Sequence, residues 1–446
     1  MKPRKPQHRN QPSPPSQPTQ SISKLVRIEK PIYGGSFLTR DEGKAIFVPL
    51  VLAGEQARVR ILENKGKRGY ATAEVEEIVA AALERVTPGC MHFGVCGGCH
   101  YQHADYAGQL LIKTDVLRET LRRGGVSASD DIAVLSAEPW AYRNRIRLAF
   151  DAAGNPGYRA RRSHAIIPIR ECPIAAPLLV RAAMVVPEIA RQFAPVMRMS
   201  ELALFCDADE KSLLASVFVA SPMKIDCAAF AKALQQQIPQ LTGLEILLQP
   251  NDREPPRRLA QWGANSIRYR AAGYDYRVDH GAFFQVNRWL VDSLVERVTA
   301  GQRGSLAWDL FAGVGLFARK LSENFARVVA VESAPLATAA LETNLDGTAG
   351  AAVALQTLEF LQRNRRDQHP DLIVVDPPRT GLGLDATTLL SEIAAPTLIY
   401  VSCDPATLAR DLQALIANGY AIESITLADL FPQTFHIESI VHLRRN

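Results

Sequence analysis

Length, composition and charge place the chain among large globular proteins and argue against several other classes. Its 446 residues are 47% hydrophobic, which suffices for two or three domains, and no apolar run reaches the ~18–20 residues of a membrane span. The net charge of +5 permits a polyanionic partner without requiring one, and seven cysteines without a secretory leader favour metal-binding or catalytic thiols over a disulfide scaffold. We expect a cytoplasmic protein with no membrane segment, and a monomer as the simplest assembly.

The chain begins with a basic tail followed by a short β-rich region. Residues 1–22 are rich in Pro, Gln and Ser, and we predict that they are disordered. Residues 23–80 contain short alternating apolar stretches separated by Gly-Gly and Ala-Gly turns, which predicts a small closed barrel of the oligonucleotide-binding (OB) kind. Its basic residues suit an RNA-facing surface and an ordinary solvated one equally well: Arg27, Lys30, Arg40, Lys44, Arg58, Arg60, Lys65, Lys67 and Arg68.

A cysteine cluster follows the barrel, at the start of a central region that we place at residues 81–270. Cys90, Cys96 and Cys99 offer three thiolates, and a tetrahedral metal centre needs a fourth ligand. Cys172 is a candidate because it stands in a Cys-Pro pair like the one that closes some ferredoxin motifs. An iron–sulfur cluster and a zinc site are both compatible with the spacing, which differs from the Cys-x3-Cys-x2-Cys of radical S-adenosylmethionine enzymes. The other possible fourth ligands are Cys206, Cys227, Cys403 and, for zinc, His92 or His100.

The central region also contains a helix and an arginine-rich strand. The leucines of YAGQLLIKTDVLRETLRRGG recur at helical spacing, and Gly-Gly makes a suitable end to that helix. Arg143, Arg145 and Arg147 alternate along a predicted strand and would therefore share one of its faces. Because few acidic residues lie nearby, this face favours contact with RNA phosphates over local ion pairs. Arg159, Arg161 and Arg162 follow shortly afterwards.

The last region, residues 271–446, alternates apolar strands with helices from SLAWDL to DPATLARDLQALIANG. Near-continuous apolar strands separated by helices predict a parallel, doubly wound α/β sheet. Ligands of such sheets bind at the carboxyl ends of the strands. We therefore look for the site where these strands stop.

Two of the strand ends carry carboxylates suited to a cofactor site. Asp309 precedes the turn FAGVG, whose glycines let the backbone approach a ligand, and Glu332 ends the next strand, where it can accept hydrogen bonds from ribose hydroxyls. A nicotinamide dehydrogenase is the competing interpretation, but an acidic residue before the turn and a late position in the chain favour a methyltransferase. Asp376 stands beside two prolines in a rigid segment, where it is placed to hydrogen-bond a planar substrate.

Cys403 is the strongest candidate for catalysis. It ends a predicted strand, with Asp404 as N-cap and Pro405 as the first residue of a helix, so the thiol lies near the positive end of that helix. A thiolate is required where the methyl acceptor is C5 of uracil, because addition to C6 creates the enolate that takes the methyl group. A base must then remove the C5 proton, and Glu438 in the strand-like C-terminal segment is the candidate.

Together these motifs resemble the bacterial RNA (uracil-C5)-methyltransferases, especially the iron–sulfur members that modify uridines in 23S ribosomal RNA (rRNA). The resemblance covers the chain from about residue 23 and depends on VTPGCMHFGVCGGCHYQH, FFQVN, DLFAGVGLFA, DPPRTGL, VSCDPATLARDL and FPQTFHIES, in that order. It implies an OB-fold TRAM barrel at residues 23–80, a central mixed α/β domain with a [4Fe–4S] cluster at 81–270, and a Rossmann-like S-adenosylmethionine (SAM) methyltransferase domain at 271–446. The implied partner is 23S rRNA.

The resemblance also implies roles for individual residues. Cys403 would be the nucleophile and Glu438 the base, and Phe283 is a candidate for stacking on the flipped target region. Where the family commonly has Cys, this chain has Ala312, a position expected to pack. The residues implied to contact SAM, or to lie beside it, are Gln285, Phe311, Leu316, Glu332, Glu359 and Asp376.

By the same resemblance, Cys172 completes the cluster with Cys90, Cys96 and Cys99. Four protein ligands leave no iron open for substrate, so the cluster would tie the segment after the barrel to the central domain. Two alternatives stay open: a non-catalytic RNA-binding protein with a structural metal, and methylation of another RNA such as tRNA.

Overall fold

The computed structural model describes residues 23–65, 69–127, 131–193, 198–251 and 254–446. These residues form two compact units, one from residues 23–30 and 36–82 and the other from residues 31–35 and 83–446. The predicted disordered tail at residues 1–22 lies outside the described residues, as do Lys67, Arg68 and the side chain of Lys65. No helix in the described part of the chain is long and apolar enough to cross a membrane.

The first unit is a small β-structure. Its strands are β1 (Ser23–Arg27), β3 (Ser36–Asp41), β4 (Lys44–Pro49), β5 (Gln56–Lys65) and β6 (Tyr70–Ala80), and the short β2 (Lys30–Ile32) falls at the boundary between the units. The strand order is β1-β5-β6-β4-β3, with all neighbours antiparallel except β4 and β6. Alternate apolar residues, among them Phe37, Val48 and Val59, are fully buried and form its core.

Part of the basic charge of this unit is balanced by its own carboxylates. Exposed ion pairs of this kind contribute little stability, but they reduce the positive potential that an RNA phosphate would meet. They account for three of the basic residues singled out in the sequence. The pairs are Arg40 with Glu29, Arg58 with Glu77, and Arg60 with Glu74.

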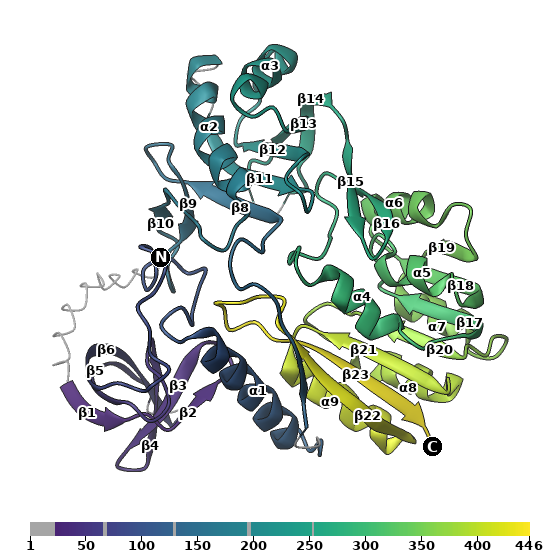
Figure 1. Cartoon of the computed structure of the whole chain (residues 1–446), viewed down its shortest axis with the longest axis horizontal. Coiled ribbons are helices and arrows are strands. Elements are labelled where there is room, and N and C mark those ends of the chain that lie inside the picture. The colour runs from purple at the N-terminus through teal and green to yellow at the C-terminus, as the bar shows by residue number, and fades with distance from the viewer. Residues whose placement is uncertain (1–22, 66–68, 128–130, 194–197, 252–253) are drawn as a thin grey trace, which may run out of the picture. The chain divides into compact units, whose positions relative to one another are not determined.

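A seven-stranded sheet forms the middle of the second unit. Its strands are β8 (Arg145–Phe150), β9 (Pro156–Arg159), β10 (Ile166–Pro168), β11 (Met199–Cys206), β12 (Leu213–Val219), β13 (Leu241–Leu248) and β14 (Arg257–Gly263). The order is β10-β9-β8-β11-β12-β13-β14, and only β12 and β13 are parallel among the described pairs. Helices α2 (Pro177–Phe193) and α3 (Cys227–Gln237) pack against it around one apolar core. A hairpin of β15 (Ser266–Ala271) and β16 (Tyr274–Asp279) follows (Figure 1).

The last third of the chain folds into a second large sheet with helices on both faces. Its strands are β17 (Gly304–Leu310), β18 (Phe325–Glu332), β19 (Gly350–Ala354), β20 (Leu372–Val375), β21 (Thr397–Ser402), β22 (Tyr420–Ala428) and β23 (Glu438–Arg445). Its helices are α4 (Val291–Thr299), α5 (Leu316–Leu321), α6 (Pro335–Leu345), α7 (Thr357–Asn364), α8 (Gly383–Ile393) and α9 (Pro405–Ala417). Buried residues of α4, α5 and α6 belong to one core, and those of α7, α8 and α9 to another.

The strand order of this sheet confirms the doubly wound prediction except at one edge. The order is β19-β18-β17-β20-β21-β23-β22 (Figure 1), with β7 (Ala133–Leu135) next to β22 at the far edge. The first five strands of this order, from β19 to β21, are parallel as predicted. Strand β23, from the C-terminal segment that the sequence indicates only as strand-like, runs antiparallel to both β21 and β22. The loop of residues 429–437 joins β22 to β23 without the crossover helix that a parallel connection needs.

Two elements from the middle of the chain join this last sheet. Strand β7 pairs with β22. Helix α1 (Tyr106–Arg123) matches the leucine pattern in the sequence: the Asp105 side chain accepts a hydrogen bond from Gly108 N at 2.7 Å, and Gly124 follows its last turn. The helix packs closely on α9, since a Cβ on Gly124 would lie 2.5 Å from Ala409 Cβ. The domain boundaries at residues 80 and 270 stay a prediction.

Candidate active site

The turn between β17 and α5 has the backbone of a ligand-binding loop. Phe311, Gly313 and Gly315 have positive φ angles of 64°, 56° and 89°. Glycine adopts such angles freely, whereas Phe311 is held there at a cost, and strain of this kind concentrates at functional sites. The strand order reverses between β17 and β20, so the turn borders the crevice in which doubly wound sheets bind ligands.

Two carboxylates support this turn through its backbone. Asp309 Oδ2 accepts a hydrogen bond from Ala318 N at 2.9 Å, and Glu332 Oε2 accepts one from Gly313 N at 3.0 Å. Burial, with the nearby charges of Asp376 and Glu332, raises the pKa of Asp309 to about 8. Both residues therefore lie at the glycine turn where the sequence predicts them.

A narrow cavity of about 30 Å³ beside the turn brings together most of the residues predicted to face SAM. Ala312 is buried there, as expected for a packing position. Phe283 is 63% exposed, which leaves its ring accessible. The predicted residues that line the cavity are Gln285, Phe311, Leu316 and Asp376, with Phe283 beside them. Their contact with a cofactor stays a prediction.

Glu359 is separate from this group. It lies in the first turn of α7, pairs with Arg363 on the same helix, and does not line the cavity. The structure gives no geometric support to its predicted contact with SAM, which stays a prediction.

Cys403 has the local setting predicted from the sequence. It directly follows β21, and Asp404 caps α9 by accepting hydrogen bonds from Ala406 N and Thr407 N at 3.0 Å each. Burial raises the pKa of the Cys403 thiol to about 12, with Glu438 and Asp376 adding to the rise and Arg379 opposing it. Burial and the neighbouring carboxylates thus outweigh the positive end of the helix.

Glu438 lies next to Cys403 across a pair of strands. Ser439 of β23 pairs with Ser402 of β21, so Glu438 comes opposite Cys403. Glu438 is only 6% exposed. Burial and the charge of Asp376 raise the pKa of Glu438 well above its usual range, and burial raises the pKa of Asp376 to about 7. The structure therefore brings together three separately predicted residues, Cys403, Glu438 and Asp376, at the carboxyl ends of β20 and β21. We call them the acidic group.

Further side chains at this acidic group were not predicted as site residues. Arg379 Nη2 lies 3.2 Å from His436 Nδ1. The hydroxyl of Tyr33 hydrogen-bonds the Asp404 carboxylate, and its ring meets Phe435 edge-on at 5.7 Å between ring centres. Arg379 had a usable indication, as the cation that follows the Asp-Pro-Pro motif. Tyr33 had none, because only the fold brings residue 33 to the end of β21.

The four predicted cluster ligands line one cavity of about 280 Å³: Cys90, Cys96, Cys99 and Cys172. Burial raises the pKa of each thiol, to about 12 for Cys99, while Arg143 opposes the rise for Cys96, Cys99 and Cys172. Phe435 and His436 also line this cavity, which therefore adjoins the loop leading to Glu438. Among the described residues, no three or more His, Cys, Asp or Glu side chains are arranged to hold a metal ion.

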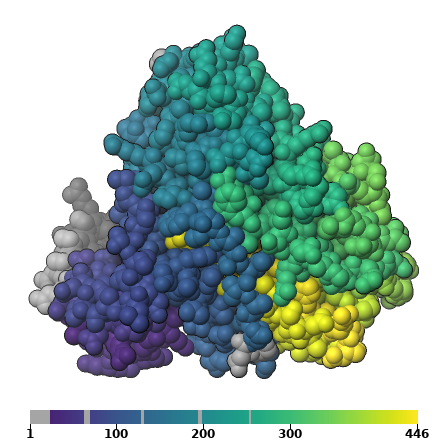
Figure 2. Space-filling model, in the orientation of Figure 1, coloured from purple at the N-terminus to yellow at the C-terminus, as the bar shows by residue number. Residues whose placement is uncertain are grey.

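The loop of residues 429–437 is held from two directions. The backbone N of His100 and of Tyr101 donate to Gln433 O at 2.8 and 3.0 Å. The Gln109 side chain of α1 donates to Gln433 Oε1 at 3.0 Å and accepts from Gln433 N at 2.9 Å. Figure 2 shows C-terminal residues, in yellow, in a small central area surrounded by blue and green atoms, as well as in a larger area at the lower right. The loop that ends at Glu438 is thus fixed by α1 and by the residues directly after Cys99.

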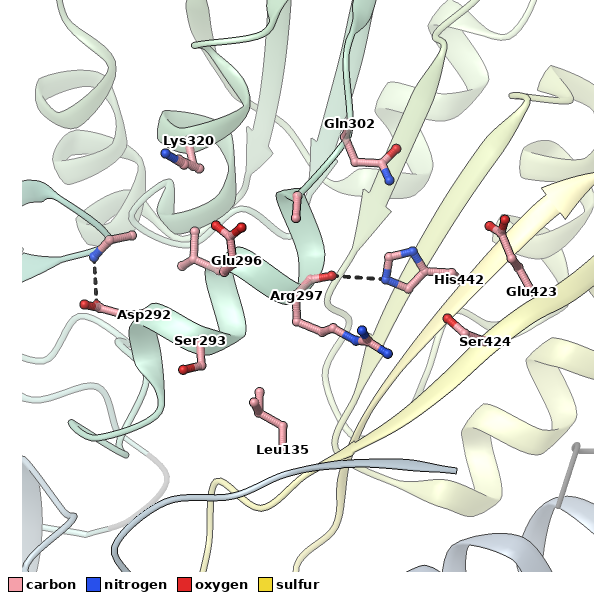
Figure 3. A pocket seen from close by; sticks show the side chains of 13 residues that line it. Leu135, Asp292, Ser293, Glu296, Arg297, Gln302, Lys320, Glu423, Ser424 and His442 are labelled. Carbon is pink, nitrogen blue, oxygen red and sulfur yellow. Dashed lines mark hydrogen bonds between the residues drawn. The ribbon is translucent and has the colours of Figure 1, made fainter. Parts of the chain in front are cut away.

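A larger cavity of about 730 Å³ lies between α4 and strands β22 and β23, as Figure 3 shows. Asp292 accepts a hydrogen bond from Ala272 N at 2.7 Å, Arg297 Nε donates to Thr426 at 2.8 Å, and Arg297 O lies 3.2 Å from His442 Nε2. The cavity is lined by charges of both signs and by none of the predicted site residues. We assign it no ligand.

Comparison with known proteins identifies the family. Residues 264–446 match the family model described as tRNA (uracil-5-)-methyltransferase. The 23S rRNA (uracil(1939)-C(5))-methyltransferase RlmD of Pectobacterium atrosepticum is 32% identical over 424 residues, which cover 91% of this chain and 90% of that protein. The chain belongs to the RNA (uracil-C5)-methyltransferase family.

Two further proteins are similar to this chain over most of its length. An uncharacterised RNA methyltransferase of Streptomyces avermitilis is 30% identical over 94% of this chain and 97% of its own. The crystal structure of the Pyrococcus abyssi tRNA (uracil-54, C5)-methyltransferase, in complex with S-adenosyl-L-homocysteine, shares the fold, with a TM-score of 0.75, 22% identity and coverage of 95% of this chain and 100% of that one. Family membership confirms the expected enzyme class, a SAM-dependent RNA methyltransferase.

Proposed function

We propose that this enzyme transfers a methyl group from SAM to C5 of a uridine in 23S rRNA. One observation carries the proposal: Cys403 and Glu438 lie side by side at the edge of the sheet, with Asp376 beside both. Buried acidic groups that raise one another's pKa are costly to the fold, and such groups concentrate at catalytic sites. The RlmD relatives, named for 23S rRNA, support the RNA class, since they match 91% of the chain.

Cys403 is the proposed nucleophile. Its thiolate adds to C6 of the uracil, the C5–C6 electron pair moves into an enolate, and C5 then takes the methyl group. Bound SAM supplies that methyl group on a positively charged sulfur. Because the pKa of the thiol is raised to about 12, Cys403 has to release its proton to solvent before it adds to C6, and the cation of Arg379 favours that release.

Glu438 is the proposed base. It takes the C5 proton after methyl transfer, the C–H electron pair re-forms the C5–C6 double bond, and Cys403 leaves as a thiolate. A carboxyl whose pKa is raised by burial is a stronger base, once ionised, than an exposed one. The raised pKa of Glu438 therefore suits proton abstraction.

We propose that Gln285, Phe311, Leu316, Glu332 and Asp376 hold SAM at the glycine turn. Small-molecule sites typically enclose roughly 300–1,000 Å³. Because the cavity here is about 30 Å³, the side chains of residues 283–285 and 311–316 have to separate when SAM binds. The exposed ring of Phe283 then has room to stack on a base.

We propose a [4Fe–4S] cluster on Cys90, Cys96, Cys99 and Cys172. The support is that all four thiols line one cavity of about 280 Å³, much larger than the ~30 Å³ share of a single water molecule and hence suited to a multi-atom group. With four protein ligands, the cluster would have a structural role. Iron and acid-labile sulfide in anaerobically purified protein would support it, whereas zinc without sulfide would refute it.

We also propose that residues 23–80 are an OB-fold barrel of the TRAM type that contacts RNA. Its short, mostly antiparallel strands support this assignment. Action as a cytoplasmic monomer stays a prediction.

The function is tested by incubating anaerobically purified protein with SAM and unmodified 23S rRNA or tRNA, followed by mass spectrometry for 5-methyluridine. We expect methylation of 23S rRNA at a mappable uridine, and none with Cys403→Ala that is folded and binds RNA. Methylation of tRNA alone would favour the second candidate, which the tRNA description of the family model supports. RNA binding without methylation of either RNA would support the alternative of a non-catalytic RNA-binding protein.

A further inference from the structure

The segment of residues 281–286 separates two cavities. Phe283, Phe284 and Gln285 line the narrow cavity at the glycine turn, whereas Gly281 and Val286 line another of about 340 Å³. The second is also lined by Phe431, from the loop that leads to Glu438. We call it the arginine cavity, because its cationic side chains are Arg143, Arg145 and Arg147.

The three arginines of this cavity alternate along the chain, and their guanidinium groups differ in their hydrogen bonds and ion pairs. Arg147 is exposed, pairs with Glu201, and lies over the ring of Phe218 at 4.6 Å. Arg143 donates from Nε to the Tyr142 hydroxyl at 3.4 Å. Arg145 and Arg143 form no ion pair with a carboxylate of the described residues. Of the three arginines, only Arg147 therefore forms a local ion pair, which was the alternative to contact with RNA phosphates.

Arg145 is a largely buried cation with incomplete hydrogen bonding. Its Nη1 donates to Ala282 O at 2.9 Å, and its guanidinium lies over the ring of Phe205 at 4.5 Å. Its Nε is buried and has no hydrogen-bond partner among the described residues. Burial lowers the pKa of Arg145 to about 10. Keeping a guanidinium in this state costs free energy that a bound anion would recover.

The acidic groups near the cavity are occupied by other partners. Asp279 accepts two hydrogen bonds from Arg277, at 2.8 and 2.9 Å. Glu245 accepts from Ser216 at 2.7 Å and lies 3.7 Å from Arg258. These carboxylates are therefore not available to neutralise Arg145, and the cavity keeps a positive character, whereas Arg143 also lines the cavity of the four cysteines.

We infer that the arginine cavity binds a backbone phosphate of the RNA close to the target uridine. The inference rests on the proposed function. Forked guanidinium donors match the oxygens of a phosphate, and a phosphate would complete the hydrogen bonding of Arg145. Arg145 also holds the carbonyl of Ala282, next to the exposed Phe283, so the bound phosphate would lie beside the segment proposed to stack on the target region.

The test compares how RNA binding by full-length wild type and Arg145→Gln depends on salt. Each phosphate contact contributes about 0.7–0.9 to the slope of log affinity against log salt. We expect Arg145→Gln to lose a slope of that size, and Arg145→Lys to keep most of it. Arg181→Gln is the matched control, because it removes one charge from an exposed arginine that does not line the cavity. A folded Arg145→Gln protein with the wild-type slope would overturn the inference.

A second measurement changes the RNA and compares wild type with Arg145→Gln. Single linkages of the RNA around the uridine are replaced by uncharged methylphosphonates, and wild-type binding is measured for each. One linkage should weaken wild-type binding about tenfold and leave Arg145→Gln binding unchanged. Equal losses for both proteins at every linkage would reject the cavity as a phosphate site, and so would a failure of any one linkage to stand out with wild type.

The two proposals fail in different ways. The salt slope is measured on whole 23S rRNA without turnover, so a reduced slope for Arg145→Gln together with no 5-methyluridine would reject the function and keep the site. Methylation with an unchanged slope would reject the site alone. If inorganic phosphate at constant ionic strength displaces RNA from wild type but not from Arg145→Gln, the cavity binds phosphate as such. If inorganic phosphate does not displace RNA from wild type at any concentration, the cavity is not a phosphate site.

Discussion

Replacement of Lys113 by methionine should strongly destabilise the second unit and misplace Glu438. Lys113 and Asp429 are 1% and 0% exposed, and their side chains are joined by a hydrogen bond of 2.5 Å. Lys113 also donates to Phe431 O at 2.9 Å, and the other oxygen of Asp429 accepts from Tyr106 at 3.0 Å. The pair therefore fixes the first residues of the loop that ends at Glu438.

The size of the effect follows from the burial of the pair. Removing one partner of a buried ion pair costs about 3–5 kcal/mol, because the other charge is left uncompensated. Unfolding entropy is roughly 2.1 cal/mol/K per residue, and the second unit holds about 370 residues. If the unit unfolds in one transition, Lys113→Met lowers its Tm by about 4–6 °C.

The assay is thermal unfolding of Lys113→Met, Asp429→Asn and the double variant, with methylation kinetics on each. The double variant should recover much of the lost stability, since it leaves no unpaired buried charge and keeps an acceptor for Tyr106. Lys211→Met is the control, because Lys211 pairs with Asp209 at the surface and should leave Tm unchanged. A Lys113→Met protein with wild-type Tm, or single-variant losses that simply add in the double variant, would refute the reasoning.

Three further predictions concern the acidic group and the glycine turn. Glu438→Gln should let Cys403 add to RNA and block release, so a covalent protein–RNA adduct should accumulate on denaturing gels; its absence with active Cys403 would count against Glu438 as base. Arg379→Gln should raise the pKa of Cys403 further and shift the pH profile of adduct formation to higher pH, and an unchanged profile would exclude this influence. Because the folded pKa of Asp309 is about 8 and its usual value is 3.8, the unfolded chain releases a proton between pH 4 and 8 that the folded protein retains, so this group lowers stability as pH rises through that window. Asp309→Asn should therefore gain stability relative to wild type from pH 4 to pH 8 in urea unfolding, and a constant difference would contradict the assignment.

The sequence predicted best where local chemistry determines structure. The apolar strand that contains Asp309 and those directly before Asp376 and Cys403 formed as expected, and Asp404 and Pro405 started α9 as a cap and a first helical residue should. Such features depend on neighbouring residues, and their periodicity and capping can be recognised in one sequence.

Contacts between residues far apart in the chain could not be predicted from the sequence. Lys113 stands on a helix where a lysine would be expected to face solvent, yet it is buried because Asp429, 316 positions further along, neutralises it. Tyr33 reaches the cap of α9 only through the fold. Nothing in the local sequence indicated that the loop of residues 429–437 would return the chain as a strand antiparallel to β22. These contacts come from tertiary structure, in which sequence separation carries little information.

The loop of residues 429–437 connects the proposed cluster to the chemistry without any electron transfer. His100 and Tyr101, directly after Cys99, hold Gln433 through their backbone, and β23 begins with Glu438 five residues later. Cys403, by contrast, follows β21, which has its own pairing in the sheet. Loss of the cluster and Lys113→Met would therefore loosen opposite sides of the same loop. Both should slow proton removal from C5 more than addition to C6, because the loop carries the base and leaves the strand of the nucleophile in place.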